Sequence, residues 1–185
     1  MELIIIAVVI FVILGFVWMT YNKLATGRVH ISEALSGIDV QLKRRIDLVP
    51  NLIETVKGYA KHEKEVFENV TKARSSLMDA QSLDEKAKSD NMLTGALKSL
   101  FAVAESYPQL KANENFLHLQ QELTDVEDKI AYARQFYNGN VRDYNTTLAN
   151  FPTGMLGNMF GFKSAEFFEA DEEAKKGPVK VSFDK

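Results

Sequence analysis

The sequence contains no cysteine, and it has only four prolines and three histidines among 185 residues. Without cysteine there is no disulfide framework, no thiolate zinc site and no thiol nucleophile. The net charge of −3, from 22 basic and 25 acidic side chains, lacks the strongly basic balance that is typical of nucleic-acid-binding proteins. Strand-like alternation of apolar and polar residues is nearly absent, so the pattern predicts an all-α protein.

Charge is distributed unevenly along the chain, because the segment from Leu3 to Asn22 has no charged side chain. As a helix, this run approaches the length of about 20 residues that a bilayer core requires. Trp18 and Tyr21 lie at its C-terminal end, where aromatic rings favour the headgroup region. The sequence therefore predicts a transmembrane anchor that contacts the membrane from Leu3 to Tyr21.

Two other interpretations of this segment are weaker. A signal peptide has a basic start and a shorter apolar core, whereas here Glu2 follows Met1; small residues at 25–27 keep cleavage open as an alternative. A buried core helix is disfavoured because the segment is apolar on every face. Lys23 and Arg28 follow the span, so the positive-inside rule predicts an external N-terminus and a cytoplasmic C-terminal domain.

Beyond residue 27, apolar residues recur at helical spacing and form coiled-coil-like seams. The helical segments cover about residues 28–46, 48–78, 83–105 and 110–150. Short connections between amphipathic helices predict an up-and-down four-helix bundle. Asp47 and Pro50 resemble the start of the second helix. If Pro50 only kinks the chain, the first two segments form one helix and the domain is a three-helix bundle. Ser82 and Glu85 predict a capping box before the third helix.

Several charged residues occupy seam positions that the helical phase assigns to the core. Glu63 falls in the seam of the second segment, and Glu127 and Arg134 fall in that of the fourth. Charged side chains inside a bundle have to pair, because an unpaired buried charge is very costly. One interpretation is a binding pocket or transmission network. The other is a buried polar layer that fixes helix register, or a seam edge that reaches solvent.

A segment rich in glycine, methionine and phenylalanine follows Pro152. Within it, Met155, Met159 and Phe160 form a candidate contact surface for a protein partner, because methionine adapts to varied surfaces. The alternative is that the segment folds over the open end of the bundle and closes the core. The histidines lack the Glu-x-x-His spacing of di-iron bundles, and no serine lies in a nucleophile elbow. We therefore expect no catalytic residue, no metal, no cofactor and no small-molecule substrate.

Long blocks of sequence provide a more specific signal. They are Asp39–Leu52, Val56–Glu63, Tyr107–Phe116 and Ala131–Asn138. These blocks resemble the LemA family in content and order, and the resemblance extends from the anchor to Phe168. It implies a single-pass, membrane-anchored protein with a helical bundle on the cytoplasmic side, and it favours four helices over three. It brings no catalytic residues. The family's genomic proximity to membrane proteases and other envelope proteins hints at an envelope-associated role.

Together these observations predict a membrane-anchored, non-enzymatic adaptor or scaffold of the bacterial cell envelope, with a protein partner at the membrane and no nucleic-acid partner. The expected layout is an anchor and juxtamembrane segment at 1–27, a LemA-like helical-bundle domain at 28–168 and a charged tail at 169–185. The alternative is a membrane-bound ligand sensor or enzyme that uses the polar seam around Glu63, Glu127 and Arg134. A deep pocket joining those residues would favour the alternative, and a closed, paired core favours the adaptor.

Overall fold

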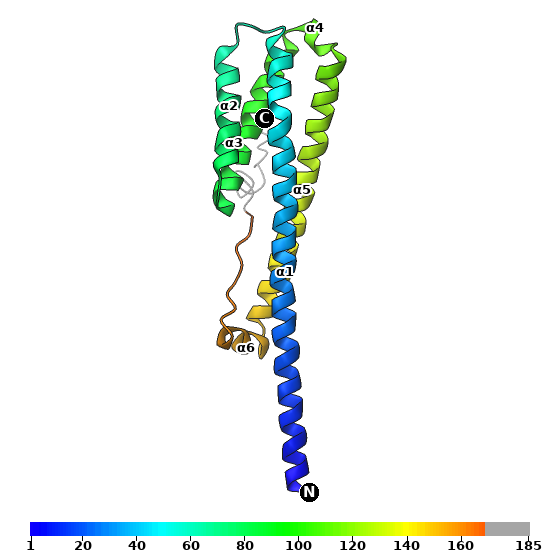
Figure 1. Ribbon diagram of the computed structural model, residues 1–185, viewed down its shortest axis with the longest axis vertical. Coiled ribbons are helices and arrows are strands. Elements are labelled where there is room, and N and C mark those ends of the chain that lie inside the picture. The colour runs from blue at the N-terminus through cyan, green and yellow to red at the C-terminus, as the bar shows by residue number, and fades with distance from the viewer. Residues whose placement is uncertain (169–185) are drawn as a thin grey trace, which may run out of the picture. The chain divides into compact units, whose positions relative to one another are not determined.

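A computed structural model describes residues 1–168, and the predicted tail at 169–185 lies outside them (Figure 1). The described chain contains no strand, so the prediction of an all-α protein is confirmed. Its helices are α1 (Glu2–Lys57), α2 (Lys64–Asp79), α3 (Leu83–Glu105), α4 (Pro108–Lys111), α5 (Glu114–Ala149) and α6 (Thr153–Met159).

The chain forms two compact units, to which α1 and α5 both contribute. We call Met1–Asp39 with Ala131–Phe167 the terminal unit, and Val40–Ile130, with which Phe168 groups, the central unit. Each unit has its own buried apolar residues.

The central unit is a helical bundle whose core follows the predicted seams. The C-terminal part of α1, then α2, α3 and the first part of α5 turn their apolar stripes toward one another, as amphipathic helices do when they bury a shared face. The rings of Phe101 on α3 and Phe116 on α5 meet edge to face with centroids 6.1 Å apart. The large side chains that are fully buried in this unit include Val49, Leu52, Val56, Val70, Leu93, Leu100, Leu110, Val126 and Phe168.

The first turn of the bundle lies later in the sequence than the residue pattern predicts. The prediction that a helix starts at Asp47–Pro50 is wrong, because α1 continues through Pro50 to Lys57. The chain turns instead between Lys57 and Lys64, where the amides of Tyr59 and Ala60 donate to the carbonyl of Val56 at 3.0 and 2.9 Å. The anchor, the first predicted helix and the start of the second are therefore one helix.

A contact between helices explains why Pro50 is accepted inside α1. Proline has no amide hydrogen, so Pro50 leaves the carbonyl of Ile46, four residues earlier, without its usual helical donor. The Nε of Arg74, on α2, donates to that carbonyl at 3.0 Å. An unsatisfied buried acceptor costs about 1–3 kcal/mol, which this bond avoids while it fastens α2 to α1.

The predicted capping box at the start of α3 is confirmed. The amide of Glu85 donates to Ser82 Oγ at 3.2 Å, and the amide of Ser82 donates to Glu85 Oε2 at 2.9 Å. Hydrogen bonds from the backbone amides of Ser82 and Gln81 lower the pKa of the Glu85 carboxyl group. The box therefore stabilises the fold at neutral pH and loses that contribution as the pH falls through the lowered pKa.

The terminal unit is built around a small apolar cluster. Leu24 on α1, Tyr144 on α5 and Phe162 after α6 are buried together, and Leu148 packs against them. A Cβ atom on Gly157 would lie 2.5 Å from Leu148 Cδ1 and 3.0 Å from Leu24 Cδ1. Glycine at this position therefore lets α6 approach α1 and α5 closely without displacing the ends of these two leucine side chains.

Polar side chains of α5 hold the extended segment that follows α6. The Asn145 side chain donates to the carbonyl of Ala165 and accepts from its amide, both at 2.9 Å. The Tyr137 hydroxyl donates to the carbonyl of Glu166 at 2.9 Å, and the Tyr144 hydroxyl donates to that of Lys163 at 3.0 Å. Burial raises the pKa of both tyrosines, so both hydroxyls remain protonated donors well above neutral pH.

The N-terminal part of α1 differs from all these surfaces, because its apolar side chains lie exposed. α1 is long and apolar enough to cross a membrane, and only 6% of its most apolar window is buried inside the protein. Leu3, Phe11 and Trp18 are 82%, 76% and 71% exposed. No protein core therefore accounts for this stretch.

A double-mutant cycle tests the link between Pro50 and Arg74. Arg74→Met removes the donor to Ile46, so we expect the free energy of unfolding to fall by about 1–3 kcal/mol in the natural sequence. In a Pro50→Ala background the amide of residue 50 bonds to the same carbonyl, so Arg74→Met should cost clearly less. Urea unfolding of the full chain in detergent, followed by circular dichroism, measures both. The exposed α2 residue Lys72, changed to Met, is the control. An equal cost of Arg74→Met in both backgrounds would contradict the prediction.

Candidate functional site

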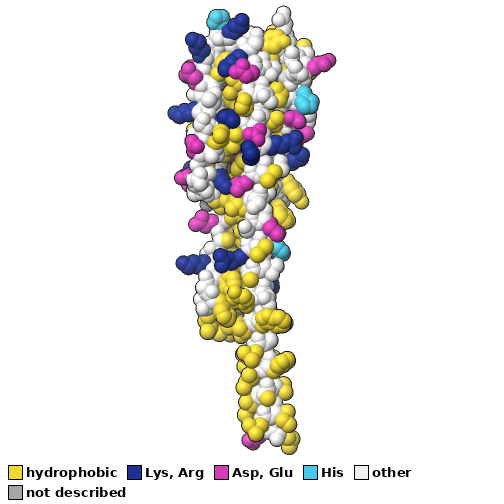
Figure 2. Space-filling view, viewed as in Figure 1, with side chains coloured by type: hydrophobic (Ala, Val, Ile, Leu, Met, Phe, Trp, Pro, Cys, Tyr) yellow, Lys and Arg dark blue, Asp and Glu magenta, His cyan; other side chains and the backbone are white. Residues whose placement is uncertain are grey.

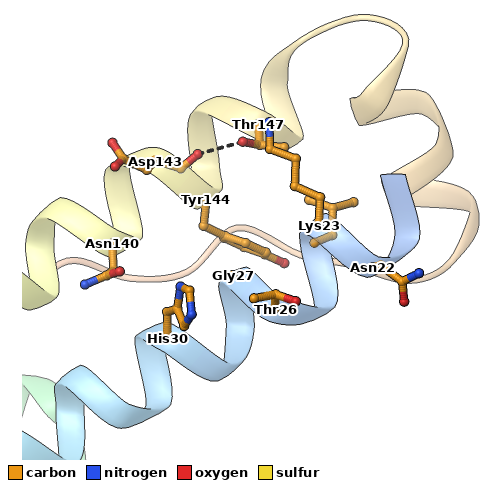
Figure 3. Close-up of a pocket in the computed structure, with 10 residues that line it drawn as sticks. Asn22, Lys23, Thr26, Gly27, His30, Asn140, Asp143, Tyr144 and Thr147 are labelled. Carbon is orange, nitrogen blue, oxygen red and sulfur yellow. Dashed lines mark hydrogen bonds between the residues drawn. The ribbon is translucent and has the colours of Figure 1, made fainter. Parts of the chain in front are cut away.

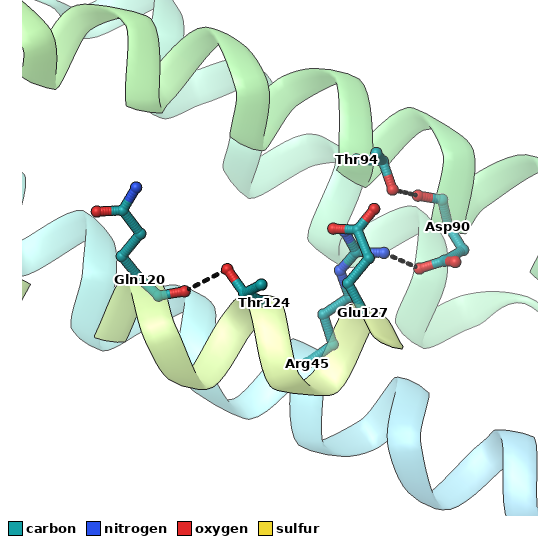
Figure 4. Close-up of polar contacts among 6 residues, drawn as sticks. All are labelled: Arg45, Asp90, Thr94, Gln120, Thr124 and Glu127. Carbon is teal, nitrogen blue, oxygen red and sulfur yellow. Dashed lines mark hydrogen bonds and ion pairs between the residues drawn. The ribbon is translucent and has the colours of Figure 1, made fainter. Parts of the chain in front are cut away.

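One buried guanidinium joins three helices of the central unit (Figure 4). Arg45 on α1 donates through Nη1 to Asp90 Oδ1 on α3 at 2.7 Å, and through Nη2 to Glu127 Oε2 on α5 at 3.2 Å. The side chains of Arg45 and Asp90 are 3% and 2% exposed, whereas that of Glu127 is 54% exposed. The ion pair is therefore closed on the Asp90 side and open to solvent on the Glu127 side.

The two arms of this network differ in strength. The Arg45–Asp90 bond is short and charge-assisted, and water does not compete for it. Burying both charges carries a desolvation cost that their attraction offsets only while both are present, and losing one partner costs about 3–5 kcal/mol. The exposed Glu127 arm is screened by solvent and contributes about 0–1 kcal/mol. The geometry is suited to holding three helices in register, because the buried charges already bond to each other.

The three charged seam residues predicted from the sequence lie in different surroundings. Glu127 joins the network through Arg45, while Arg134 belongs to the terminal unit. Glu63 precedes α2, where its Oε1 accepts a hydrogen bond from the Tyr107 hydroxyl at 3.4 Å. Arg45 lies 12 residues before the end of α1 at Lys57, or about 18 Å along the helix from the turn that contains Glu63. Glu63 and the Arg45 network are therefore separate features of the central unit.

Asp90, the most buried carboxylate of the network, is the residue that sequence reasoning missed. It shares a seven-residue row with Leu83, Leu97 and Ala104 on α3, so a charged residue stands in an otherwise apolar seam. The same argument that singled out Glu127 on α5 applies to it. Arg45 stands next to Ile46 of the apolar stripe on α1, and its partner is clear only once α1 and α3 lie side by side.

The segment rich in methionine and phenylalanine divides between core and surface. Gly154 and Gly157 are buried, whereas Met155, Met159 and Phe160 are 57%, 75% and 48% exposed. The segment thus packs against the cluster of the terminal unit and also presents a large apolar surface. The use of the exposed part as a contact surface stays a prediction.

A groove of about 420 Å³ runs between α1 and α5 within the terminal unit (Figure 3). Lys23 and His30 of α1 face Asp143 and Thr147 of α5 across it, and the Tyr144 ring lies along its floor against Gly27, 3.0 Å from where a Cβ would be. The Thr147 hydroxyl is already bonded to the carbonyl of Asp143 at 2.9 Å. Among the described residues, no group of three or more histidines and carboxylates is placed to hold a metal ion.

Over residues 1–168 these features define a class of helical protein. In it, an exposed apolar N-terminal helix continues into a bundle that holds a buried ion pair. The LemA family matches residues 34–183, and the chain belongs to this family.

The chain is similar to curated proteins that carry two kinds of name. It is 26% identical to magnetosome protein MamQ 2 of Paramagnetospirillum magneticum and 24% identical to magnetosome protein MamQ of Magnetospirillum gryphiswaldense, over 82% and 81% of its length. It is 28% identical to protein LemA of Metamycoplasma hominis over 82% of its length. The match covers 65% of each of the two magnetosome proteins and 69% of the third.

The two carboxylates that bond to Arg45 differ in burial, so we expect their removal to differ in its cost to stability. Asp90→Ala strands a buried guanidinium, so we expect the free energy of unfolding to fall by about 3–5 kcal/mol. Glu127→Ala should change it by about 0–1 kcal/mol, because that carboxylate is exposed. Replacing the pair with apolar residues, Arg45→Met with Asp90→Leu, should recover most of the loss. Urea unfolding of the full chain measures all three variants.

Asp84→Ala is the matched control for this series. Asp84 lies on the same helix as Asp90, but it is 67% exposed and paired only with Lys88 on the surface. If Asp90→Ala and Asp84→Ala had the same midpoint of unfolding, the network would not hold the helices together as described.

Proposed function

We propose that the chain is a single-pass membrane protein whose helical module works as a non-enzymatic adaptor or scaffold in the bacterial cell envelope. One observation carries the proposal. The exposed apolar run of α1 ends at Tyr21, and three residues later Leu24 is 1% exposed in the cluster of the terminal unit. The same helix therefore changes from a surface that suits lipid to a surface that suits protein, with no linker between them.

The exposure of the apolar run supports an anchor in a bilayer. An isolated helix that is apolar on all sides is unfavourable in water and favourable in a bilayer core about 30 Å thick. The burial of Leu24 also argues against a cleaved signal peptide. Cleavage near residues 25–27 would remove Leu24 from the core in which Tyr144 and Phe162 pack against it.

The charge pattern supports an external N-terminus and a cytoplasmic module. Lys23 and Arg28 follow the span, and the positive-inside rule favours the cytoplasmic side for cations in this position. In this layout residues 1–27 serve as anchor and juxtamembrane segment, 28–168 as the module and 169–185 as a charged tail.

The adaptor role is favoured over a ligand sensor or enzyme built on the polar seam. At that seam Arg45 and Asp90 are 3% and 2% exposed and already bonded to each other, which leaves the carboxylate of Glu127 as the group of the network that solvent reaches. Large side chains on the outer face of α5 are instead available to a protein partner. Tyr132 and Phe136, one helical turn apart, are 72% and 55% exposed.

A charged residue within the span tests the anchor. Val9→Arg places a cation near the middle of the apolar run, where it costs about 2.5–3.5 kcal/mol on translocon scales, so the membrane-bound fraction should fall. Val40→Arg, at an exposed position on the same helix but outside the span, should leave it unchanged. Carbonate-washed membranes, analysed by immunoblot, give the fraction.

Reporter fusions to the C-terminus test the orientation of the protein in the membrane. A C-terminal green fluorescent protein should fluoresce and a C-terminal alkaline phosphatase should be inactive. The reverse result would overturn the orientation.

Photo-cross-linking in the native membrane tests the adaptor role. A photoreactive amino acid at Phe136 should give the same adduct in independent preparations, since this exposed ring is offered as the contact. The same amino acid at Arg142, a 72% exposed charged position on α5, should give none or a weaker adduct. If neither position, nor Tyr132, captures a reproducible partner, the adaptor role is wrong.

A further inference from the structure

The chain contains a second long uncharged stretch, from Tyr144 to Phe162, besides the anchor. It includes the end of α5, the turn at Phe151 and the whole of α6. The anchor accounts for the first uncharged stretch, but the apolar cluster of the terminal unit accounts for only part of the second.

The packing of α6 leaves its two methionine side chains exposed. The helix buries the face that carries Gly154 and Gly157, three residues apart, and at Gly157 even a Cβ would meet Leu148. Met155 and Met159, four residues apart, lie on another face and are 57% and 75% exposed. Because the glycine face of α6 lies against the cluster, the two methionines lie outside the core.

Two phenylalanines extend this surface at either end of α6. Phe151 is 85% exposed and Phe160 is 48% exposed. We call Phe151, Met155, Met159 and Phe160 the apolar foot. Figure 2 shows apolar side chains gathered at this end of the terminal unit beside the apolar stretch of α1. Soluble surfaces rarely gather so many large apolar side chains unless a partner or a membrane covers them.

Ring contacts fix the depth of the foot relative to the anchor. The centroid of the Tyr21 ring lies 5.3 Å from that of Phe160 and 5.5 Å from that of Phe162, both edge to face. Tyr21 ends the apolar run of α1, and Trp18 lies one turn before it. Phe160 therefore lies at the level of the chain where aromatic side chains mark the boundary between bilayer and water.

We propose that the apolar foot lies in the interfacial layer of the same bilayer that α1 spans, with its methionine and phenylalanine side chains among the upper acyl chains. This inference rests on the proposed membrane anchor. The occupant of the surface is phospholipid, because the foot is continuous through Tyr21 with the part of α1 that lipid surrounds. The anchor then has two contacts with the membrane, a spanning helix and a short helix at its surface.

The charges near the foot agree with this depth. Lys23 follows the uncharged stretch of α1, and Lys163 follows the uncharged stretch from Tyr144 to Phe162, so a cation comes directly after each stretch. The guanidinium of Arg28 lies 6.0 Å from the centre of the Phe162 ring. Arg28 follows Tyr21 on α1 by about two helical turns, so it lies further from the membrane. Cations at this level meet the phosphate groups of lipid headgroups.

Fluorescence quenching in vesicles measures the depth of the foot directly. The natural chain has no cysteine, so single substitutions Met159→Cys, Met19→Cys and Glu33→Cys each accept one environment-sensitive nitrobenzoxadiazole label. The full-length variants are reconstituted into vesicles of phosphatidylcholine and phosphatidylglycerol in equal parts. One quencher is phosphatidylcholine with a nitroxide on the upper acyl chain, and the other is iodide in the water.

Met19 reports the anchor, and Glu33, exposed on α1 beyond the span, reports water. We expect lipid nitroxide to quench the label at Met159 several-fold more than the label at Glu33, at a level near that of Met19. Iodide should give the opposite order. Phe151→Cys, at the most exposed position of the foot, should agree with Met159 and guards against a local disturbance by one label.

Each other outcome overturns the inference in a distinct way. If iodide quenches Met159 as strongly as Glu33 while lipid nitroxide quenches only Met19, the anchor stands and the foot lies in water. If Met159 is shielded from both quenchers while Met19 is lipid-quenched, protein covers the foot, either a partner or a second copy of the chain. If Met19 itself is not quenched by lipid, the anchor fails and the foot's membrane contact fails with it.

Discussion

The structure depends on α1 remaining helical through Pro50. A proline in a helix interior removes one hydrogen bond and costs about 3 kcal/mol, which is enough to end most helices. Here the freed carbonyl of Ile46 accepts from Arg74, so a bond between helices replaces the one that was lost within the helix. Because α1 does not break, it supplies both the apolar run and the seam residues Val49, Leu52 and Val56. If the helix ended at Pro50, the chain would need a further turn there, and the apolar run and the later seam residues would lie on two different helices.

The bond between Arg74 and Ile46 also shows why only part of the fold could be predicted from the sequence. Helical periodicity and the capping box of Ser82 and Glu85 are local, so they could be deduced residue by residue. The fate of Pro50 could not, because Arg74 lies 24 positions further along and its bond exists only after α2 has packed on α1. The rule that proline starts a helix is a statement about an isolated segment, and tertiary contact overrides it.

The candidate site, like the fold, could be predicted from the sequence only in part. Seam position indicated that Glu127 would have to pair, but periodicity does not specify which helix supplies the partner. The pairing of Arg45 with Asp90 depends on how α1 and α3 face each other, and that geometry is set by the surrounding apolar contacts. A polar layer of this kind adds little net stability compared with apolar residues of the same volume, yet it penalises any register that separates the charges. A layer that fixes helix register suits the non-enzymatic adaptor that we propose.

Glycine determines how the terminal unit meets its surroundings. At Gly27 the Tyr144 ring lies 3.0 Å from where a Cβ would be, and at Gly157 the side chains of Leu148 and Leu24 occupy that space. These two positions let α1, α5 and α6 approach closely with few large side chains between them. The cost of so thin a core is that Met155 and Met159 remain outside it, where water is the least favourable solvent for them. The exposure of the apolar foot is therefore a consequence of how α6 packs, and a bilayer next to Tyr21 relieves it without any change in that packing.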